Sequence, residues 1–263
     1  MSITPDANGS ALPMSPSLEV MAERVLAASR AERRTLVAIA GPPAAGKSTL
    51  AEALCARIDA LRPGYVALVP MDGYHFDNAV LIPQGRLDIK GAPETFDVAG
   101  LSHDLARLRR DDGPVAVPLF DRPLDLARAG ARLIQPGHRL VLVEGNYLLL
   151  DRAPWRALRS FFDLTLFIEV PDAVLVERLL QRWHDLGQDA AEAARRTHAK
   201  DMLNAQLIKA HSVAPDWHWH FLAGTSDAPE TLGAPAIADS SDTAGSIDTA
   251  GSSRVSDSPG PAG

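Results

Sequence analysis

The chain has 263 residues, 46% of them hydrophobic, so it can bury the core of one α/β domain with extensions. Its net charge is −7, but the acids gather from Leu222 onward, and the nearly neutral remainder gives no electrostatic case for nucleic-acid or membrane partners. The single cysteine, Cys55, excludes intramolecular disulfides, and no apolar stretch approaches membrane-spanning length, so we expect a cytoplasmic protein.

Both ends of the chain have the composition of disordered segments. Residues 1–16 are rich in Pro, Ser, Ala and Gly. Residues 223–263 are acidic, repeat Asp-Thr-Ala-Gly-Ser twice and contain almost no large apolar residues, so they cannot offset the entropy cost of ordering. A single domain is therefore predicted over residues 17–222. It opens with an amphipathic helix over Ser17–Arg33, with Val20, Val25 and Leu26 as its apolar contacts.

The stretch from Gly41 to Ser48 fits the pattern G-x-x-x-x-G-K-[ST]. It follows an apolar segment suited to a buried strand (Leu36–Ala40) and precedes a predicted helix (Thr49–Ala60). In such a loop, backbone N–H groups and the helix dipole point at an anion, Lys47 reaches the β- and γ-phosphates, and Ser48 ligates Mg²⁺. We therefore predict a site for ATP and Mg²⁺. Its nucleotide-binding residues are Gly41, Pro42, Pro43, Ala44, Ala45, Gly46, Lys47, Ser48 and Thr49.

The second predicted strand, Tyr65–Pro70, ends just before Met71-Asp-Gly-Tyr-His75. Ligands of parallel sheets bind beyond the carboxyl ends of the strands, which is where Asp72 falls. Asp72 could accept a proton from an attacking hydroxyl. The alternative is a turn-capping aspartate, which is the commoner role beside glycine. The position after the strand favours the catalytic role.

A turn-rich segment, Ile82–Phe96, leads to a predicted helix at Leu101–Arg110 and a short strand at Val115–Leu119. Asp121 follows that strand, in Pro118-Leu-Phe-Asp-Arg122. It would touch the substrate or form a salt bridge to Arg122 or another neighbour, and the sequence does not separate these roles.

Glu144 follows a strongly apolar predicted strand, His138–Val143. A carboxylate in that place is typical of the arrangement that holds Mg²⁺ or its water shell in P-loop proteins. The alternative is an exposed acid at the end of a strand. The metal role is favoured because the phosphate-binding loop requires such a partner.

The last elements are a strand at Leu164–Val170, helices at Asp172–Leu186 and Asp189–His211, and an edge strand at Trp217–Leu222. Strands that alternate with helices predict a doubly wound, mostly parallel sheet of about five strands with helices on both faces.

Arg178 and Arg182 share one face of the first of these two helices, being four residues apart. They could clamp a transferring phosphoryl group, although spacing alone favours a solvated helix face. His218 and His220 share a side of the edge strand and are interpreted as surface residues.

Together the loop, Asp72-Gly73, Glu144-Gly145 and the later arginines resemble the phosphoribulokinase, uridine kinase and bacterial pantothenate kinase family. The resemblance covers about residues 18–222. One branch, variously labelled nucleoside or nucleotide kinase-like and fructose-transport-system kinase-like, matches four further strings. They are Met71–His75, Lys90–Asp97, Pro118–Arg122 and Val143–Asp151, of which Lys90-Gly-Ala-Pro-Glu-Thr-Phe-Asp97 is the most specific.

The resemblance implies a P-loop NTPase fold with a helical lid at about residues 178–204. It implies Asp72 as general base, Glu144 as a Mg²⁺-side carboxylate, and Arg178 and Arg182 as lid arginines, which moves both arginines from surface to function. Residues 90–97 would form part of the acceptor site. The candidate catalytic residues are thus Asp72, Lys47, Arg178 and Arg182, and the metal residues are Ser48 and Glu144. The candidate substrate residues are Tyr74, His75, Lys90, Glu94, Thr95, Phe96, Asp121 and Tyr147.

Two positions depart from the family pattern. Ala44 stands where many relatives have a third loop glycine, which is tolerated if its φ is negative. Lys200-Asp201 stands where the resemblance leads us to expect Asn-Asp, so an acceptor contact there stays open.

The sequence thus predicts an ATP-dependent kinase that phosphorylates a hydroxyl of a small metabolite: a sugar, a nucleoside or a pantothenate-like alcohol. The alternative is a P-loop NTPase that acts as a regulatory or conformational switch without a small-molecule acceptor. The guanine signature Asn-Lys-x-Asp is absent, which counts against a GTPase switch. The sequence is also compatible with a homodimer.

Overall fold

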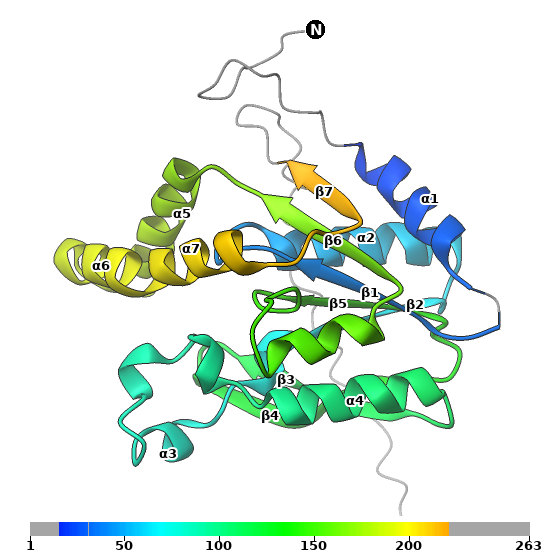
Figure 1. Ribbon diagram of the computed structural model, residues 1–263, viewed down its shortest axis with the longest axis horizontal. Coiled ribbons are helices and arrows are strands. Elements are labelled where there is room, and N and C mark those ends of the chain that lie inside the picture. Colours follow the sequence, from blue (N-terminus) through cyan, green and yellow to red (C-terminus); the bar gives the residue numbers. More distant parts are fainter. Residues whose placement is uncertain (1–15, 31, 221–263) are drawn as a thin grey trace, which may run out of the picture. The chain divides into compact units, whose positions relative to one another are not determined.

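The computed structural model describes residues 16–30 and 32–220, so the disorder expected for residues 1–16 and 223–263 lies, apart from residue 16, outside the described residues. The main sheet has five strands in the order β2-β5-β1-β6-β7, and each neighbouring pair is parallel (Figure 1). The strands are β1 (Thr35–Ala40), β2 (Val66–Pro70), β5 (Leu140–Gly145), β6 (Leu164–Glu169) and β7 (Trp217–His220). The predicted parallel α/β sheet is confirmed. None of the described helices is both long and apolar enough to span a bilayer.

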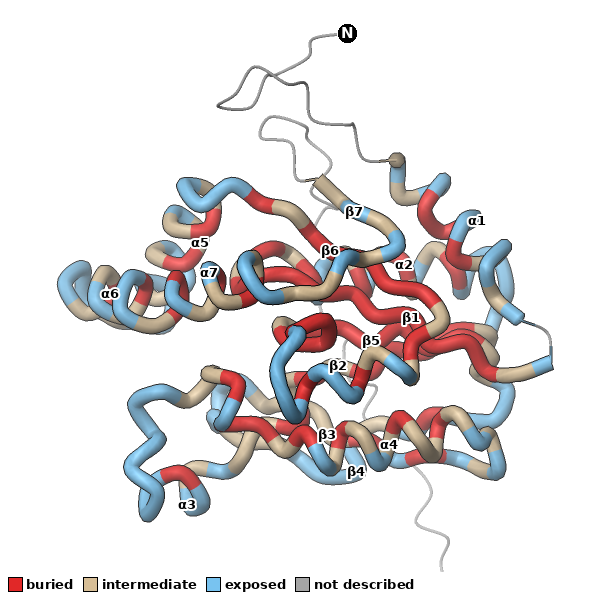
Figure 2. The backbone as a smooth tube through the Cα atoms, viewed as in Figure 1, coloured by how far each residue is buried: buried red, intermediate tan, exposed pale blue. Residues whose placement is uncertain are grey.

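Alternate residues of β1, β2, β5 and β6 face two separate cores. Leu36 and Ala38 of β1 pack on one face with α4 (Val98–Arg110), whereas Val37 and Ile39 pack on the other. That second face is covered by α1 (Leu18–Ala28), α2 (Lys47–Leu61) and α5 (Asp172–Asp185). Figure 2 shows the strands buried between these layers. Because both faces are covered, the strands contain near-continuous apolar runs, which is why sequence analysis located them.

The leading helix is shorter than predicted. It ends at Ala28, where the cap residue Ser29 has extended backbone, and not at Arg33. Val25 is buried as expected, but Val20 is exposed, and Met21 and Ala22 make the contacts in its place.

The expected strand at Val115–Leu119 exists, but it does not join the main sheet. It forms β3 (Val115–Asp121), which pairs antiparallel with β4 (Leu126–Ile134) in a separate two-stranded hairpin. We did not predict β4, because its sequence Leu-Ala-Arg-Ala-Gly-Ala-Arg-Leu-Ile is mostly exposed and lacks a clear apolar alternation. The hairpin packs against the turn η1 (Met71–Tyr74), so closely that a Cβ on Gly73 would lie 2.3 Å from the Pro118 carbonyl oxygen.

The long helix predicted at Asp189–His211 is interrupted. It consists of α6 (Ala190–Arg196), a π-helical turn η5 (Thr197–Asp201) and α7 (Met202–His211). Short helical turns make up the rest of the chain between the strands. They are α3 (Asn78–Leu81), η2 (Leu87–Ile89), η3 (Pro93–Thr95) and η4 (Trp155–Phe161).

Candidate active site

The phosphate-binding loop connects β1 to α2. Gly41 lies against β6, where a Cβ would come 3.0 Å from the Ile168 carbonyl oxygen, and Gly46 has φ +90° at the start of α2. Ala44 has φ +59°. Alanine would be free of strain here only with a negative φ. Ala44 instead lies in the left-handed region that favours glycine.

Lys47, Ser48 and Glu144 lie together at the carboxyl end of the central strands. Ser48 Oγ donates to Glu144 Oε1 at 3.3 Å, and Lys47 Nζ donates to the Pro42 carbonyl at 2.8 Å. Burial lowers the pKa of Lys47 to about 8, while burial and then the nearby Asp72 raise the pKa of Glu144 to about 7. The environment thus disfavours both charges, as is usual where a ligand later supplies compensating charge.

The oxygens of Ser48 and Glu144 suit Mg²⁺, which prefers hard oxygen ligands and few protein groups beside phosphate and water. Among residues 16–30 and 32–220, no cluster of three or more His, Cys, Asp or Glu side chains could hold a metal ion by itself. Two protein oxygens beside a triphosphate are the pattern expected for Mg²⁺ in a phosphoryl-transfer site. Glu144 is also buried, so it is not the exposed strand-end acid of the alternative.

Asp72 sits on the η1 turn beside the loop. Its carboxylate accepts a hydrogen bond from Arg122 Nη2 at 2.9 Å, and no backbone N–H in the described part of the chain is its partner, so the turn-capping role does not apply. Gly145 permits this placement because a Cβ there would come 2.3 Å from Met71 Cβ. Asp72 is close enough to raise the pKa of both Lys47 and Glu144, which brings the three groups into one site.

His75 supports the same turn. Its Nδ1 lies 2.8 Å from the Asp72 carbonyl oxygen, and its ring packs at a tilt against Phe96 and Phe120, with ring centres 4.0 Å and 4.7 Å away. Burial lowers the pKa of His75, so the ring is neutral near pH 7. Because a carbonyl only accepts, Nδ1 carries the proton and Nε2 is left as an acceptor.

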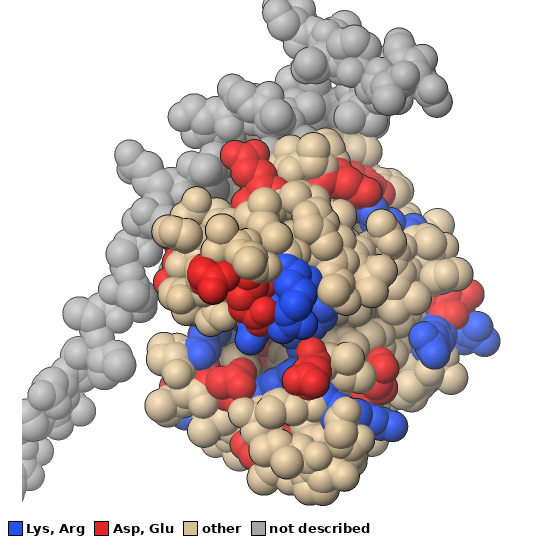
Figure 3. Space-filling model, turned by 90° about the vertical axis from the view of Figure 1, so that its left-hand side faces the viewer, with Lys and Arg blue, Asp and Glu red and all other residues tan. Residues whose placement is uncertain are grey.

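Arg178 and Arg182, the two arginines expected in the lid, face the loop. Arg178 Nη1 donates to the Ala44 carbonyl at 3.2 Å, and Arg182 acts electrostatically on Lys47. Arg182 keeps more than a third of its surface exposed, yet surrounding protein and then Arg122 lower its pKa. That combination is typical of the wall of an open cleft. Figure 3 shows this side of the molecule, with basic and acidic side chains around a hollow.

Two of the charged candidates for acceptor binding, Lys90 and Asp121, form ion pairs that involve the hairpin. Lys90 Nζ donates to Asn78 Oδ1 and to the Asp125 carbonyl, both at 2.7 Å, and it lies 3.0 Å from Asp125 Oδ2. Asp121 pairs with Arg128 at 3.3 Å and not with Arg122. Arg122 and Asp125 were not among the residues expected in the site, and only the hairpin that sequence analysis missed brings them there.

The remaining candidates for acceptor binding are mostly buried, and their side chains form hydrogen bonds or ring contacts with other segments of the chain. Tyr74 Oη donates to Asp104 at 2.9 Å, and Tyr147 Oη donates to the Gly91 carbonyl at 2.6 Å. Thr95 Oγ1 donates to the Ala92 carbonyl at 2.8 Å, and Phe96 packs edge-on against Tyr147. Glu94 alone is exposed. These contacts hold residues 90–97 in shape, and burial raises the pKa of both tyrosines.

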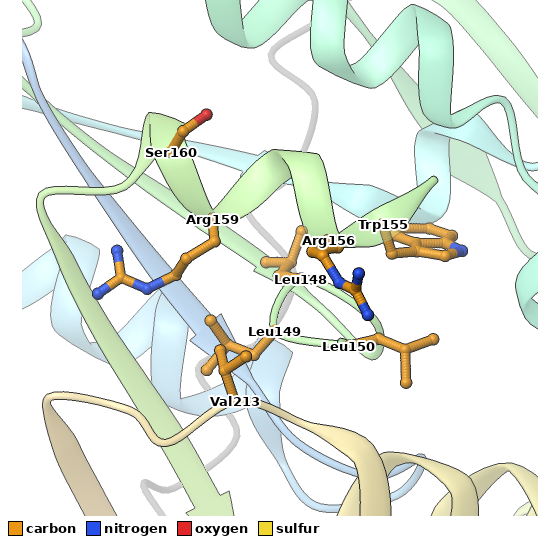
Figure 4. Close-up of a pocket in the computed structure, with 8 residues that line it drawn as sticks. All are labelled: Leu148, Leu149, Leu150, Trp155, Arg156, Arg159, Ser160 and Val213. Carbon is orange, nitrogen blue, oxygen red and sulfur yellow. The ribbon is translucent and has the colours of Figure 1, made fainter. Parts of the chain in front are cut away.

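A separate cavity of about 420 Å³ lies beside η4 and shares no residue with this site. It is lined from η4, from the segment after β5 and from the segment after α7 (Figure 4). Its two arginines already have acidic partners, since Arg156 pairs with Asp151 and Arg159 with Asp216. The chemistry-bearing groups therefore gather at the loop and not at this cavity.

Comparison with known proteins gives relatives over most of the described chain. No protein-family model matches the sequence. A Schizosaccharomyces pombe protein named "Putative uridine kinase C227.14" is 31% identical over 213 residues, which covers 76% of this chain and 88% of that protein. The Escherichia coli K12 protein YggC, which is uncharacterized, is 40% identical over 154 residues, or 57% of this chain and 62% of its own length.

Among solved structures, that of a protein from Silicibacter sp. TM1040 is similar over most of this chain. It is described as a "putative fructose transport system kinase". The two chains are 41% identical with a TM-score of 0.73, and the match covers 78% of this chain and 99% of that one.

Proposed function

The chain belongs to the phosphoribulokinase, uridine kinase and bacterial pantothenate kinase family of P-loop kinases, and on that premise we propose that it transfers the γ-phosphate of ATP to a hydroxyl of a small metabolite. The family resemblance inferred from the sequence is thereby confirmed. The acceptor and the roles of individual residues are part of the proposal.

One observation carries the proposal: Lys47, Asp72 and Glu144 meet at the carboxyl end of the parallel strands, although they come from three distant segments. A loop that binds a triphosphate needs only Lys47 and a carboxylate beside the metal, which here is Glu144. A second carboxylate, placed on a turn that opens toward the hairpin, is what a hydroxyl acceptor requires.

Each group has a defined task in this proposal. The loop amides and Lys47 hold the phosphates, and Arg178 and Arg182 neutralise charge on the transferring group from the lid. Ser48 and Glu144 would hold Mg²⁺, which neutralises phosphate charge when bound. Little covalent chemistry falls to the protein, so alignment and charge stabilisation supply most of the rate.

Asp72 would accept the proton of the attacking hydroxyl. The Arg122 guanidinium now occupies its Oδ2, one of the two oxygens that could take the proton of the acceptor hydroxyl. We therefore infer that Arg122 moves off Asp72 when the acceptor binds. Its side chain is 55% exposed and sits on the hairpin turn, where such a movement meets little packing.

The test is ATP consumption by the full chain with Mg²⁺ and a panel of sugars, nucleosides and hydroxy acids, including fructose, uridine, pantothenate and glycerate. We expect one class of acceptor to raise ADP formation well above the acceptor-free rate, with a phosphorylated product visible by mass spectrometry. Acceptor-independent ATP hydrolysis at a useful rate, or a stable protein partner with no phosphorylated product, would favour the switch alternative.

A further inference from the structure

Asp72 is open to water as well as to an acceptor. It lies beside the nucleotide loop because Pro70 pairs with Glu144 in the register of β2 with β5, and Ser48 of the loop bonds Glu144. The Asp72 side chain is 26% exposed, so water reaches it when no acceptor is bound. A carboxylate that accepts a proton from a hydroxyl can also accept one from water. Selectivity for the metabolite therefore needs a further group beside Asp72.

Arg122 is the group that occupies Asp72. Its Nη2 donates to Asp72 Oδ2 at 2.9 Å across the space between the hairpin and η1. Oδ2 can receive a proton only after this bond breaks or the carboxylate turns. The ion pair thus holds the base of the proposed reaction in a resting arrangement.

The hairpin fixes the backbone of Arg122 but not its side chain. In the turn between β3 and β4, Asp125 N donates to the Arg122 carbonyl at 3.2 Å, and Pro118 of β3 packs closely against Gly73 of η1. The Arg122 side chain is nevertheless 55% exposed, so it can swing off Asp72 without disturbing that packing. An ion pair this exposed is weak, because water competes for both partners.

Even a weak ion pair distinguishes a metabolite from water. A metabolite gains binding free energy from groups remote from its reacting hydroxyl, and part of that energy can offset the loss of the pair. A single water molecule has no such groups. The pair therefore opens when the metabolite binds and stays closed when only water is present.

We propose that Arg122 makes phosphoryl transfer selective for the metabolite over water, by holding Asp72 Oδ2 until the acceptor binds. The inference rests on the proposed kinase function and makes Arg122 a positioning residue that acts through Asp72. The reaction that it suppresses is hydrolysis of ATP. In that reaction the water oxygen bonds to the γ-phosphorus, and the bond from this phosphorus to the β–γ bridging oxygen breaks, its electron pair leaving with ADP. One proton of the water passes to Asp72 and then to solvent, and inorganic phosphate is released.

The test measures release of inorganic phosphate from Mg²⁺-ATP by the full chain without any acceptor. Arg122→Ala should raise this rate about 10-fold or more, because a general base is typically worth about 10²–10⁴-fold and water would use part of that effect. Arg128→Ala is the matched control. It removes an arginine of the same hairpin that is 57% exposed and lies 3.3 Å from its own carboxylate partner, Asp121. It should leave phosphate release within about twofold of the wild type.

The double variant Asp72→Asn/Arg122→Ala shows whether the gain depends on Asp72. An asparagine does not take up the proton, so hydrolysis should return to the wild-type rate or below. Damage to the fold lowers activity, so a gain that disappears with Asp72 distinguishes this role from a structural one. Melting curves of all variants report folding.

The outcomes separate the two proposals. With an acceptor present, Arg122→Ala should convert a smaller share of the consumed ATP into phosphorylated product. Unchanged phosphate release in Arg122→Ala, an equal rise in Arg128→Ala, or a rise that survives Asp72→Asn overturns the role of Arg122, and the kinase function stands if the wild type phosphorylates an acceptor. A wild type that hydrolyses ATP at a useful rate and phosphorylates no member of a broad panel counts against the kinase function and, with it, against this role of Arg122.

Discussion

The nucleotide side and the acceptor side of the cleft are built in different ways. The nucleotide side centres on one contiguous stretch, Gly41–Ser48, which is largely buried and shaped by its backbone, and adds Glu144 from β5. The acceptor side combines η1, residues 90–97, the hairpin and the lid, and its contacts are made by side chains. Many of those side chains, including Arg122 and Asp125, are exposed at the cleft.

This difference explains how one fold serves several substrates. Backbone groups present the same donors whatever the side chains are, so the loop keeps its ligand across a family. Side-chain contacts on the acceptor side, such as the pair of Arg122 with Asp72, can change with single substitutions. Variants on the two sides should therefore fail in distinguishable ways.

The largest effect is expected on the acceptor side, from Asp72→Asn. Loss of a general base typically costs about 10²–10⁴-fold in rate, so kcat should fall by that amount while the KM for ATP stays nearly unchanged. Steady-state kinetics with the true acceptor measures both constants. Near-normal turnover in the variant would show that Asp72 is not the base.

Lys47→Ala tests the nucleotide side. Lys47 meets the phosphates in the ground state and the transition state alike, so ATP affinity and turnover should both fall, with kcat/KM reduced about 10²–10³-fold. ATP titration and kinetics on the same preparation provide the comparison. If both stay at wild-type values, the loop is not part of the active site.

Glu144→Gln tests how much the buried negative charge of Glu144 on the nucleotide side lowers the stability of the fold. A carboxyl whose pKa rises from 4.5 to about 7 on folding binds its proton more tightly in the folded state, so folding stability falls as pH rises between these values. Above pH 7 the folded protein bears the full loss of stability that comes from ionising Glu144. In EDTA at pH 8 the variant should be more stable by about 2 kcal/mol, and this gain should shrink toward pH 5.

Melting curves at both pH values measure that gain, and Mg²⁺-ATP should reverse its sign, because the variant lacks a metal ligand. A Glu144→Gln protein that melts below the wild type at pH 8 without metal would mean that Glu144 stabilises the empty site through Lys47.

Between the two sides lies the lid, where the functional interpretation and the surface interpretation differ most. If Arg178 and Arg182 close over the phosphates, alanine at either position should lower kcat about 10-fold or more with the fold intact. Lysine should restore activity only in part, because an ammonium lacks the forked contact to phosphate oxygens. A solvated face would instead change stability by under about 0.5 kcal/mol and leave the rate unchanged.

Sequence analysis located the nucleotide side well because its signal is local. Four of the five sheet strands, β1, β2, β5 and β6, follow from apolar runs, and the helix after the loop follows from the fixed spacing of the motif. The acceptor side was predicted less well. β4 has no apolar alternation, and the ion pair of Arg122 with Asp72 joins residues 50 apart, which no local pattern records. The resemblance supplied residues 90–97, but only the fold shows that most of them support one another.

The smallest predicted effect concerns the nucleotide loop itself. Ala44 has φ +59°, which costs a residue with a side chain about 1–2 kcal/mol, whereas glycine adopts it freely but loses more entropy on folding. Ala44→Gly should therefore raise stability by up to about 1 kcal/mol, with ATP kinetics within twofold. Ala45→Gly is the matched control, because Ala45 is buried and does not have a positive φ, so the same change there should lower the melting temperature. A higher melting temperature in Ala44→Gly and a lower one in Ala45→Gly would establish that residue 44 keeps a backbone conformation that favours glycine, although it is an alanine. Equal losses of melting temperature in both would mean that the loop carries no such strain, and that backbone entropy alone decides the outcome.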